Sequence, residues 1–244
     1  MHYRPGRGGV EVGDRGAPLG GWMPLVLRVS GLRVLVLGGG SVGGRRALQF
    51  ASGGARVRVA ALEFSEELRR AAAGGEVELV RADLRDAREL RDLIAWADLV
   101  VVATSDPEVN RAASALALEL GKLVNDATEA GRGNVMVPFH RRIERLGITV
   151  AVTSLGRAGV AARLALERCA ETLEGDAELY TIAHTMAKLK EWLKSVEPDP
   201  KRRLPIYFMV AEDPEYRRLA RDGLVDEALR RALAIASTAL GVKS

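Results

Sequence analysis

The chain carries the stretch RVLVLGGGSVGGRR at residues 33–46. Its apolar run predicts a buried strand over 33–37, and the glycine-rich turn after it opens a predicted helix over 41–52. The glycines fit the spacing G-x-G-x-x-G: the first permits a tight turn, the second lets backbone amides approach a pyrophosphate, and the third lets the helix pack on the strand. The helix start offers unpaired amides and the positive end of its dipole to an anion. The residues expected to meet the phosphates of a dinucleotide are Gly38, Gly40, Ser41, Val42 and Gly43.

Strand and helix patterns alternate between Leu25 and about Val152. This alternation predicts an α/β fold with a parallel, doubly wound sheet of the Rossmann type. A glycine turn in such a sheet that binds nothing is the structural alternative to a dinucleotide site. The predicted strands cover 33–37, 56–60, 76–80, 98–103, 122–125 and 148–152, and the predicted helices cover 41–52, 65–73, 86–95 and 107–120.

The last third of the chain is predicted to be all-helical. A helix is expected over 159–173, and a long amphipathic helix follows Gly175-Asp176. Its apolar stripe either packs within its own domain or forms a dimer seam. The stripe consists of Leu179, Ile182, Met186, Leu189 and Leu193.

Prolines divide the helices that follow. Pro198 and Pro200 end the long helix, and Lys201-Arg202-Arg203 is interpreted as a solvated turn, with contact to an anionic ligand as the alternative. Another helix is expected from Asp213-Pro214, with an interruption at Gly223 before a closing helix over 224–240.

Composition is that of an ordinary globular protein. The 244 residues are 48% hydrophobic and 28% charged, and no apolar run is long enough for a membrane span or a signal peptide. Residues 1–22, rich in Gly and Arg, predict a disordered leader. These features predict a cytoplasmic protein with no membrane partner.

The charge distribution argues against a nucleic-acid-binding protein, and the few Cys and His residues argue against a metalloprotein. The net charge is only +4, and the basic residues are mixed with acids, which argues against nucleic-acid binding. The single cysteine, Cys169, lies in a helical pattern and is expected in the core, and the three histidines are far apart. No metal site is therefore predicted.

A second segment bears on the cofactor. Ala103 ends the predicted strand 98–103 and Thr104 follows it, and ligands of open parallel sheets lie outside the carboxyl ends of strands. This segment is expected to border the same crevice as the glycine turn. Thr104 is assigned to a ribose or to the nicotinamide amide, and Asp106 to the cap of the helix that begins at Pro107.

The second strand bears on the choice of nucleotide. It ends near Ala61 without the acid that usually holds the ribose hydroxyls, and Glu63 stands two or three residues late. No arginine follows immediately to bind a 2′-phosphate, which favours NAD over NADP as the cofactor.

Polar residues end the next strand, where substrate would meet nicotinamide. Asn125 is assigned to the cofactor, and Asp126 or Glu129 could act as a general base or orient the substrate. The alternative for each acid is a solvated loop position. Small residues and arginines at further turns suit an anionic, polycarboxylate substrate, namely Arg132, Ser154, Gly156, Arg157 and Arg163.

Several linked motifs together resemble the precorrin-2 dehydrogenase family of siroheme synthesis, over about residues 23–240. These motifs are Met23-Pro24-Leu25, VLGGGSVGGRR at 36–46, ATSDPEVN at 103–110, Val124-Asn125, Val137-Pro138 and the segment from Ser154 to Arg163. The resemblance implies NAD-dependent oxidation of precorrin-2, a tetrapyrrole, to sirohydrochlorin by a homodimer. It implies the stand-alone form, without a fused methyltransferase domain. Some members also insert ferrous iron, and the resemblance leaves this activity open.

The resemblance also divides the chain. It implies an NAD-binding Rossmann domain over 23–135, a dimerisation region over 136–175 and a helical C-terminal domain over 176–244. The sequence departs from the family at two positions. Thr128 stands at the catalytic position where many members carry an aspartate, and Ala158 stands where some carry a serine. Asp126 is the acid nearest to Thr128.

Two other functions remain open. A regulatory nucleotide-binding module of the potassium-transport type also combines a glycine turn with a segment like the one at 103–110. Such modules usually keep the acid after the second strand, and they end in a small α/β unit instead of long helices. A catalytically inactive dimeric scaffold is the third possibility, suggested by Thr128.

Overall fold

The computed structural model describes residues 21–242, so the predicted leader at 1–22 lies almost wholly outside the described residues. The chain divides into two compact units, one ending at Val100 and the other beginning at Val101. Each unit is described by itself. Among the described residues, no helix is long and apolar enough to cross a membrane.

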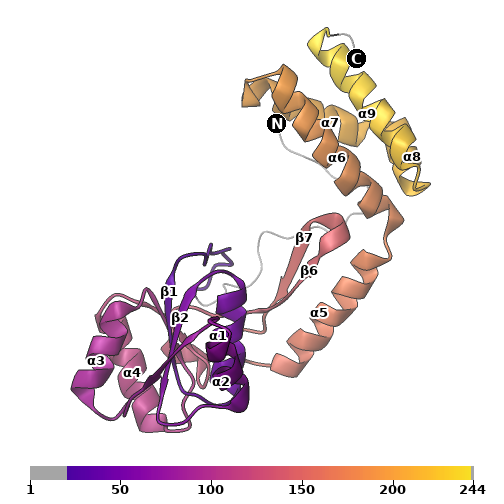
Figure 1. The fold of residues 1–244 in the computed structure, drawn as a ribbon. Helices are drawn as coiled ribbons and strands as arrows, with labels where there is room; N and C mark the ends of the chain where they lie inside the picture. Colours follow the sequence, from indigo (N-terminus) through magenta and orange to yellow (C-terminus); the bar gives the residue numbers. More distant parts are fainter. Residues whose placement is uncertain (1–20, 243–244) are drawn as a thin grey trace. The chain divides into compact units, whose positions relative to one another are not determined.

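A five-stranded sheet forms the centre of the α/β fold, with the strand order β3-β2-β1-β4-β5 (Figure 1). Strands β1, β2 and β3 pair in parallel, with Val34 opposite Val57 and Val59 opposite Leu79. Strands buried on both faces read as continuous apolar runs, and every residue of β4 is buried. The predicted Rossmann-type sheet is therefore confirmed. Its strands are β1 (Arg33–Leu37), β2 (Arg56–Ala61), β3 (Glu78–Arg81), β4 (Leu99–Val102) and β5 (Leu123–Asp126).

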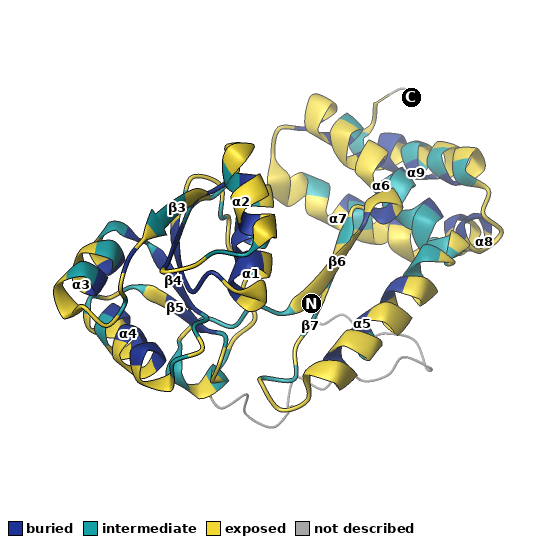
Figure 2. Cartoon of the chain, turned by 60° about the horizontal axis from the view of Figure 1, so that its bottom comes forward, coloured by how far each residue is buried: buried dark blue, intermediate teal, exposed yellow. Residues whose placement is uncertain are grey.

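Helices cover both faces of the strands of the first unit. Helices α1 and α2 lie on one side of β1 and β2, and α3 lies on the other (Figures 1 and 2). Ser65 and Asp86 cap α2 and α3, and in the second unit Asp106 caps α4, as predicted. The helices are α1 (Ser41–Ser52), α2 (Glu66–Ala73), α3 (Ala87–Trp96) and α4 (Pro107–Glu119).

The segment 148–152 is predicted as a strand of the parallel sheet, but it forms one strand of a separate β-hairpin. This segment, β7 (Ile148–Val152), pairs antiparallel with β6 (Phe139–Ile143) in a separate two-stranded sheet and does not join the parallel sheet. Its residues are alternately exposed and half-buried, whereas a strand inside a parallel sheet is buried on both faces. Helix α5 (Gly159–Glu174) packs on both strands of the hairpin.

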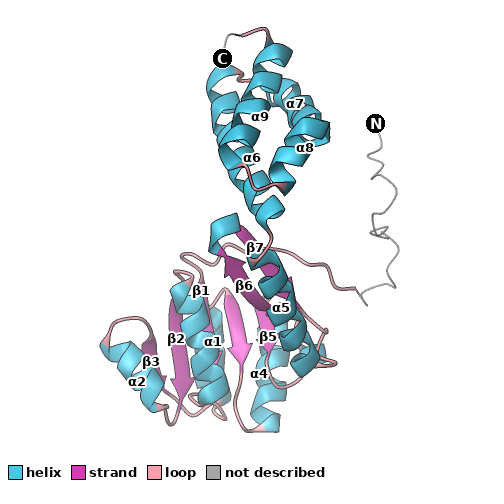
Figure 3. Ribbon diagram, turned by 90° about the vertical axis from the view of Figure 1, so that its right-hand side faces the viewer, coloured by secondary structure: helices cyan, strands magenta, loops and turns pink. Residues whose placement is uncertain are grey.

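Four helices follow α5 in the chain, and Figure 3 labels them α6 to α9. Leu189 and Leu193 are fully buried against α8 and α9, with Ile182 and Met186 packed beside them. Leu179 packs in a second cluster with Ile143 and Leu146. The apolar stripe thus packs within its own unit, which is the first of its two interpretations. The four helices are α6 (Ala177–Val196), α7 (Pro200–Glu212), α8 (Pro214–Arg221) and α9 (Val225–Leu240).

Two local predictions are wrong. Lys201-Arg202-Arg203 forms the first turn of α7 and not a solvated turn, because the Asp199 carboxylate accepts a hydrogen bond from the Lys201 amide and Pro200 occupies the first helical position. Cys169 is exposed and not in the core, because α5 buries only a narrow stripe at every fourth residue, Ala162, Leu166 and Ala170, and Cys169 falls outside it.

Candidate functional site

The glycine turn places the start of α1 directly at the end of β1. Gly38 has a φ of +117°, which L-residues rarely adopt, and its amide donates to the Ala60 carbonyl at 2.9 Å. A Cβ on Gly43 would collide with the Gly38 carbonyl oxygen. The helix can begin this close to the strand only because residue 43 is glycine.

The start of α1 fits the pyrophosphate of a dinucleotide. Gly40 is the N-cap, so no side chain caps the amides of Ser41 and Val42, and the first turn contains no acid. A Cβ on Gly40 would meet nothing within 4 Å. Free helix amides beside open space suit an anion, so the assignment of these residues to the phosphates stays a prediction.

The predicted ribose segment lies beside the turn. The Ser65 amide donates to the Gly39 carbonyl at 2.9 Å, and a Cβ on Gly39 would collide with the backbone of Glu63. Ala61 is buried and the Glu63 side chain is exposed. The structure therefore brings the predicted cofactor residues of the first unit together at the ends of β1 and β2.

Two glycine variants separate ligand binding from folding. Gly40→Ala should keep the melting temperature, because φ is −79° and the site is open, and should weaken NAD binding roughly tenfold because its methyl group takes the space of the phosphates. Gly43→Ala should instead lose about 1–3 kcal/mol of stability through its clash with Gly38. Thermal unfolding and calorimetric NAD titration of both variants measure the difference. An unchanged NAD affinity in Gly40→Ala contradicts the phosphate site.

In the second unit, the buried carboxylate of Asp126 organises the loop after β5. Its Oδ1 accepts hydrogen bonds from the Thr128 hydroxyl at 2.7 Å and from the Thr128 and Glu129 amides at 2.9 Å. Its Oδ2 accepts from Ser114 Oγ and from Arg132 Nε, both at 2.9 Å. Five donors therefore hold one carboxylate that is 4% exposed.

These contacts keep Asp126 ionised. Burial alone would raise the pKa of Asp126, but the hydrogen bonds from Thr128, the Glu129 amide and Ser114 outweigh burial, so the pKa lies below its usual value. A carboxylate that is ionised and saturated with donors is a poor base. The geometry favours the orienting role of Asp126 over proton removal.

Thr104 and Thr128 belong to one hydrogen-bond network. Thr104 Oγ1 donates to Asn110 Oδ1 at 2.6 Å, and Asn110 Nδ2 donates to the Thr104 carbonyl at 3.1 Å and to Thr128 Oγ1 at 3.4 Å. Arg132 Nη2 also donates to Thr128 Oγ1, at 3.0 Å. The network connects the loop after β4 to the loop after β5 and uses the hydroxyls of both threonines.

Arg132 and Glu129 complete this cluster. Besides Asp126, the Arg132 guanidinium faces the Glu129 carboxylate, with Nη1 3.4 Å from Oε2. The Arg132 side chain is 23% exposed and that of Glu129 is 65% exposed. Within this cluster, Glu129 therefore provides the carboxylate most open to a ligand.

Asn125 carries an unpaired buried acceptor. Its Nδ2 donates to the Val135 carbonyl at 3.0 Å, which fixes the orientation of the amide, but Oδ1 is buried and has no partner among the described residues. Asn125 is 5% exposed. A buried acceptor of this kind suits an N–H group of a bound molecule.

The predicted substrate residues are partly brought together. A Cβ on Gly156 would approach Cβ of Ala130 to 2.7 Å, which places the turn before α5 against the 3₁₀ helix η1 (Ala130–Arg132). Ser154 Oγ accepts from the Ala158 amide at 2.8 Å. Arg157 is exposed in this turn, whereas Arg163 lies further along α5 beside Glu167.

Sequence reasoning missed Asn110 and Ser114. Both are almost fully buried on α4, four residues apart, on the face that also buries Ala113 and Ala117. Polar residues at helical spacing on an otherwise apolar face were the available signal. They hold the loops that carry Thr104 and Asp126.

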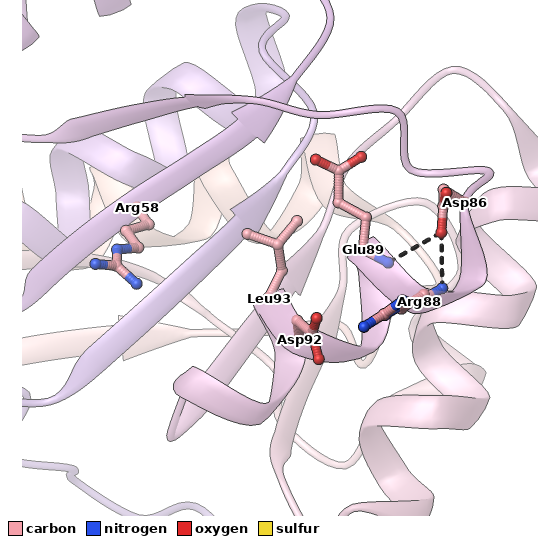
Figure 4. A pocket seen from close by; sticks show the side chains of 6 residues that line it. All are labelled: Arg58, Asp86, Arg88, Glu89, Asp92 and Leu93. Carbon is pink, nitrogen blue, oxygen red and sulfur yellow. Dashed lines mark hydrogen bonds between the residues drawn. The ribbon is translucent and has the colours of Figure 1, made fainter.

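An open hollow of about 460 Å³ lies beside α3 and is not the candidate site (Figure 4). Its polar lining already has structural partners. Arg58 pairs with Glu78 and stacks on Trp96, and Asp86 caps α3 through the Arg88 and Glu89 amides. Among the described residues, no group of three His, Cys, Asp or Glu side chains is placed to hold a metal ion.

Removing the Asp126 charge should destabilise the protein. Asp126→Asn removes the buried carboxylate that pairs with Arg132 and accepts from Thr128 and Ser114, and should cost about 3 kcal/mol of unfolding free energy at neutral pH. The folded-state pKa is lowered, so this stabilisation is present above the ordinary value of 3.8 and is lost as the pH falls below it. Urea unfolding over a pH series checks both expectations. Glu108→Gln, which breaks an exposed pair with Arg111, is the matched control and should change little. An equal loss for Asp126→Asn at all pH values contradicts the assignment.

The doubly wound sheet and its glycine turn define a dinucleotide-binding protein of the Rossmann class. Residues 25–139 match the model of a family described as putative NAD(P)-binding. The chain is 33% identical over 223 residues to the precorrin-2 dehydrogenase of Methanosarcina barkeri (strain Fusaro / DSM 804), covering 90% of this chain and 95% of that protein. The chain belongs to the precorrin-2 dehydrogenase family.

Two other comparisons agree. The chain is 34% identical over 218 residues to the siroheme synthase of Pseudomonas putida (strain W619), covering 87% of this chain and 44% of that longer protein. A solved structure of SirC, precorrin-2 dehydrogenase, superposes with a TM-score of 0.63 at 20% identity and covers 90% of this chain and all of that one. The second likeness concerns the fold alone.

Proposed function

We propose that the chain oxidises precorrin-2 to sirohydrochlorin with NAD as the hydride acceptor. The observation that carries this proposal is the likeness to the Methanosarcina precorrin-2 dehydrogenase over 90% of the chain. The uncapped helix start behind the glycine turn supports it, since those amides suit the phosphates of the cofactor. A likeness that includes the helical tail favours the enzyme over a regulatory module.

The residues of the chain have distinct roles in this proposal. The amides of Ser41 and Val42 hold the pyrophosphate, and Oδ1 of Asn125 accepts an N–H of the bound cofactor. Glu129 removes the substrate proton, because it is the accessible acid of its cluster. Asp126 positions the loop that carries Glu129 and also holds the guanidinium of Arg132 beside it.

The activity is tested with purified protein, precorrin-2 and NAD under anaerobic conditions. NADH should form, seen in its absorbance, together with the spectrum of sirohydrochlorin. Glu129→Gln should lower kcat about 100-fold or more with unchanged NAD affinity. A wild type that binds NAD without forming NADH contradicts the dehydrogenase and favours the regulatory module. Full turnover by Glu129→Gln contradicts only its role as base.

We also propose a homodimer formed through the region 136–175, in the cytoplasm. Val160 and Leu164 on α5 are 75% and 45% exposed, and Phe139 on β6 is 40% exposed. Exposed apolar side chains on a helix and the hairpin beneath it are typical of a surface that a partner covers.

Light scattering of the full chain tests the dimer. Wild type should have twice the mass of one chain, and Val160→Asp with Leu164→Asp should have the mass of a monomer, because the charges would be buried in the interface. Leu204→Asp, at a residue of α7 that is 57% exposed, is the matched control and should remain dimeric. A monomeric wild type overturns this proposal. Iron insertion lies outside the proposal, which is confined to the oxidative step.

A further inference from the structure

The hydroxyl group of Thr104 belongs to the loop after β4, and ligands of open parallel sheets bind outside the carboxyl ends of the strands. Thr104 is the second residue after the strand, which ends at the fully buried Val102. Thr104 itself is half-buried. It is therefore held by the chain and still accessible to a bound molecule.

Asn110, which is 3% exposed, fixes the direction of this hydroxyl. The Thr104 amide donates to Asn110 Oδ1 at 3.2 Å, and Asn110 Nδ2 donates to the Thr104 carbonyl at 3.1 Å. A backbone amide only donates and a carbonyl only accepts, so these two contacts determine which end of the Asn110 side chain is the oxygen. Because Oδ1 carries no hydrogen, the Thr104 hydroxyl at 2.6 Å from it is the donor.

One position of the Thr104 hydroxyl remains for a ligand. Its single hydrogen is directed to Asn110 Oδ1, and the Asp106 carbonyl at 3.2 Å, the other acceptor in reach, also belongs to the chain. One lone pair accepts from the Asp106 amide at 3.1 Å. A hydroxyl group has one hydrogen and two lone pairs, so the position that is left is a lone pair. Toward a ligand, Thr104 accepts a hydrogen bond and donates none.

Thr128, the other threonine of the network, has no position left. Its hydroxyl donates to Asp126 Oδ1 at 2.7 Å and accepts from Arg132 Nη2 at 3.0 Å and from Asn110 Nδ2 at 3.4 Å. Its hydrogen and both lone pairs are therefore used within the chain. The side chain of Asn110 thus completes one hydroxyl and leaves the other as an acceptor.

We propose that Thr104 accepts an N–H of the nicotinamide carboxamide, and that Asn110 is the positioning residue that makes Thr104 an acceptor. The inference rests on the proposed function, which supplies NAD as the cofactor. A ribose hydroxyl donates or accepts and needs no acceptor fixed in advance, whereas an amide NH2 group only donates. A fixed acceptor disfavours a ligand that has no N–H at this point, because the lone pair then loses its partner. Thr104 therefore selects the carboxamide.

The test compares NAD with 3-acetylpyridine adenine dinucleotide, which keeps the carbonyl of the carboxamide and carries CH3 in place of NH2. Calorimetry on the full chain gives both affinities. Wild type should bind NAD at least about tenfold more tightly than the analogue. Thr104→Val keeps the shape of the side chain and removes the lone pair, so it should bind NAD about tenfold more weakly with unchanged affinity for the analogue. Thr104→Ser keeps the hydroxyl and should retain the wild-type preference.

Asn110→Leu tests the positioning role. Without Oδ1, the Thr104 hydroxyl is released to turn and donate to a carbonyl oxygen, which NAD and the analogue both carry. The preference for NAD should therefore fall toward one, an effect that a loss of stability alone does not produce. Ser105→Ala removes the exposed hydroxyl of the neighbouring residue, so it is the matched control and should retain the wild-type preference.

The outcomes separate this inference from the proposed function. A wild type that forms NADH but binds NAD and the analogue equally overturns the role of Thr104 and leaves the dehydrogenase standing. Equal weakening of both ligands in Thr104→Val overturns it in favour of a structural role. An unchanged preference in folded Asn110→Leu overturns the positioning role, and if that variant does not fold, Thr104→Val and Thr104→Ser decide the proposal. A wild type that binds neither dinucleotide overturns the proposed function as well.

Discussion

The close approach of α1 to β1 at Gly43 is the constraint on which the dinucleotide site depends. A side chain at this position would collide with the Gly38 carbonyl, and the helix would then have to begin further from the strand. With glycine there, the amides of Ser41 and Val42 open at the end of the strand, and Gly40 leaves them uncapped. The same packing that forms the βαβ core therefore leaves helix amides free for phosphate oxygens. Folding and cofactor binding share one contact.

Asp126 organises the candidate site of the second unit, as Gly43 organises that of the first, but it does so through hydrogen bonds. Five hydrogen bonds to one buried carboxylate fix the backbone of residues 128 and 129 and the guanidinium of Arg132. Thr128, which stands where many family members carry aspartate, donates its hydroxyl to this carboxylate and accepts from Arg132. The acid that the position lacks is present two residues earlier, but it is buried and saturated. The open acid of the cluster is Glu129, which stands next to Thr128 in the sequence.

The sequence predicts most of the fold because its signals are local. The glycine spacing, the apolar run of β4 and the cap at Asp106 each determine one element, and all three agree with the structure. The hairpin was missed because β6 reads FHRRI, with three charged or polar residues, and because pairing between β6 and β7 is not visible in either strand alone. The candidate site is harder still. The sequence does not reveal that Asp126 accepts a hydrogen bond from Ser114. By residue type alone Asp126 is a candidate catalytic acid, and only its hydrogen-bond partners indicate a structural role.

Arg132 and Arg46 differ in whether a carboxylate neutralises their charge within the chain. Arg132 is neutralised within the chain, so its loss would leave Asp126 buried without its cation and would be felt in stability first. Arg46 has a neutral amide as its partner, so the folded state gains little from its charge. The counter-charge of an arginine, and not its residue type, therefore indicates whether its removal is felt first in stability.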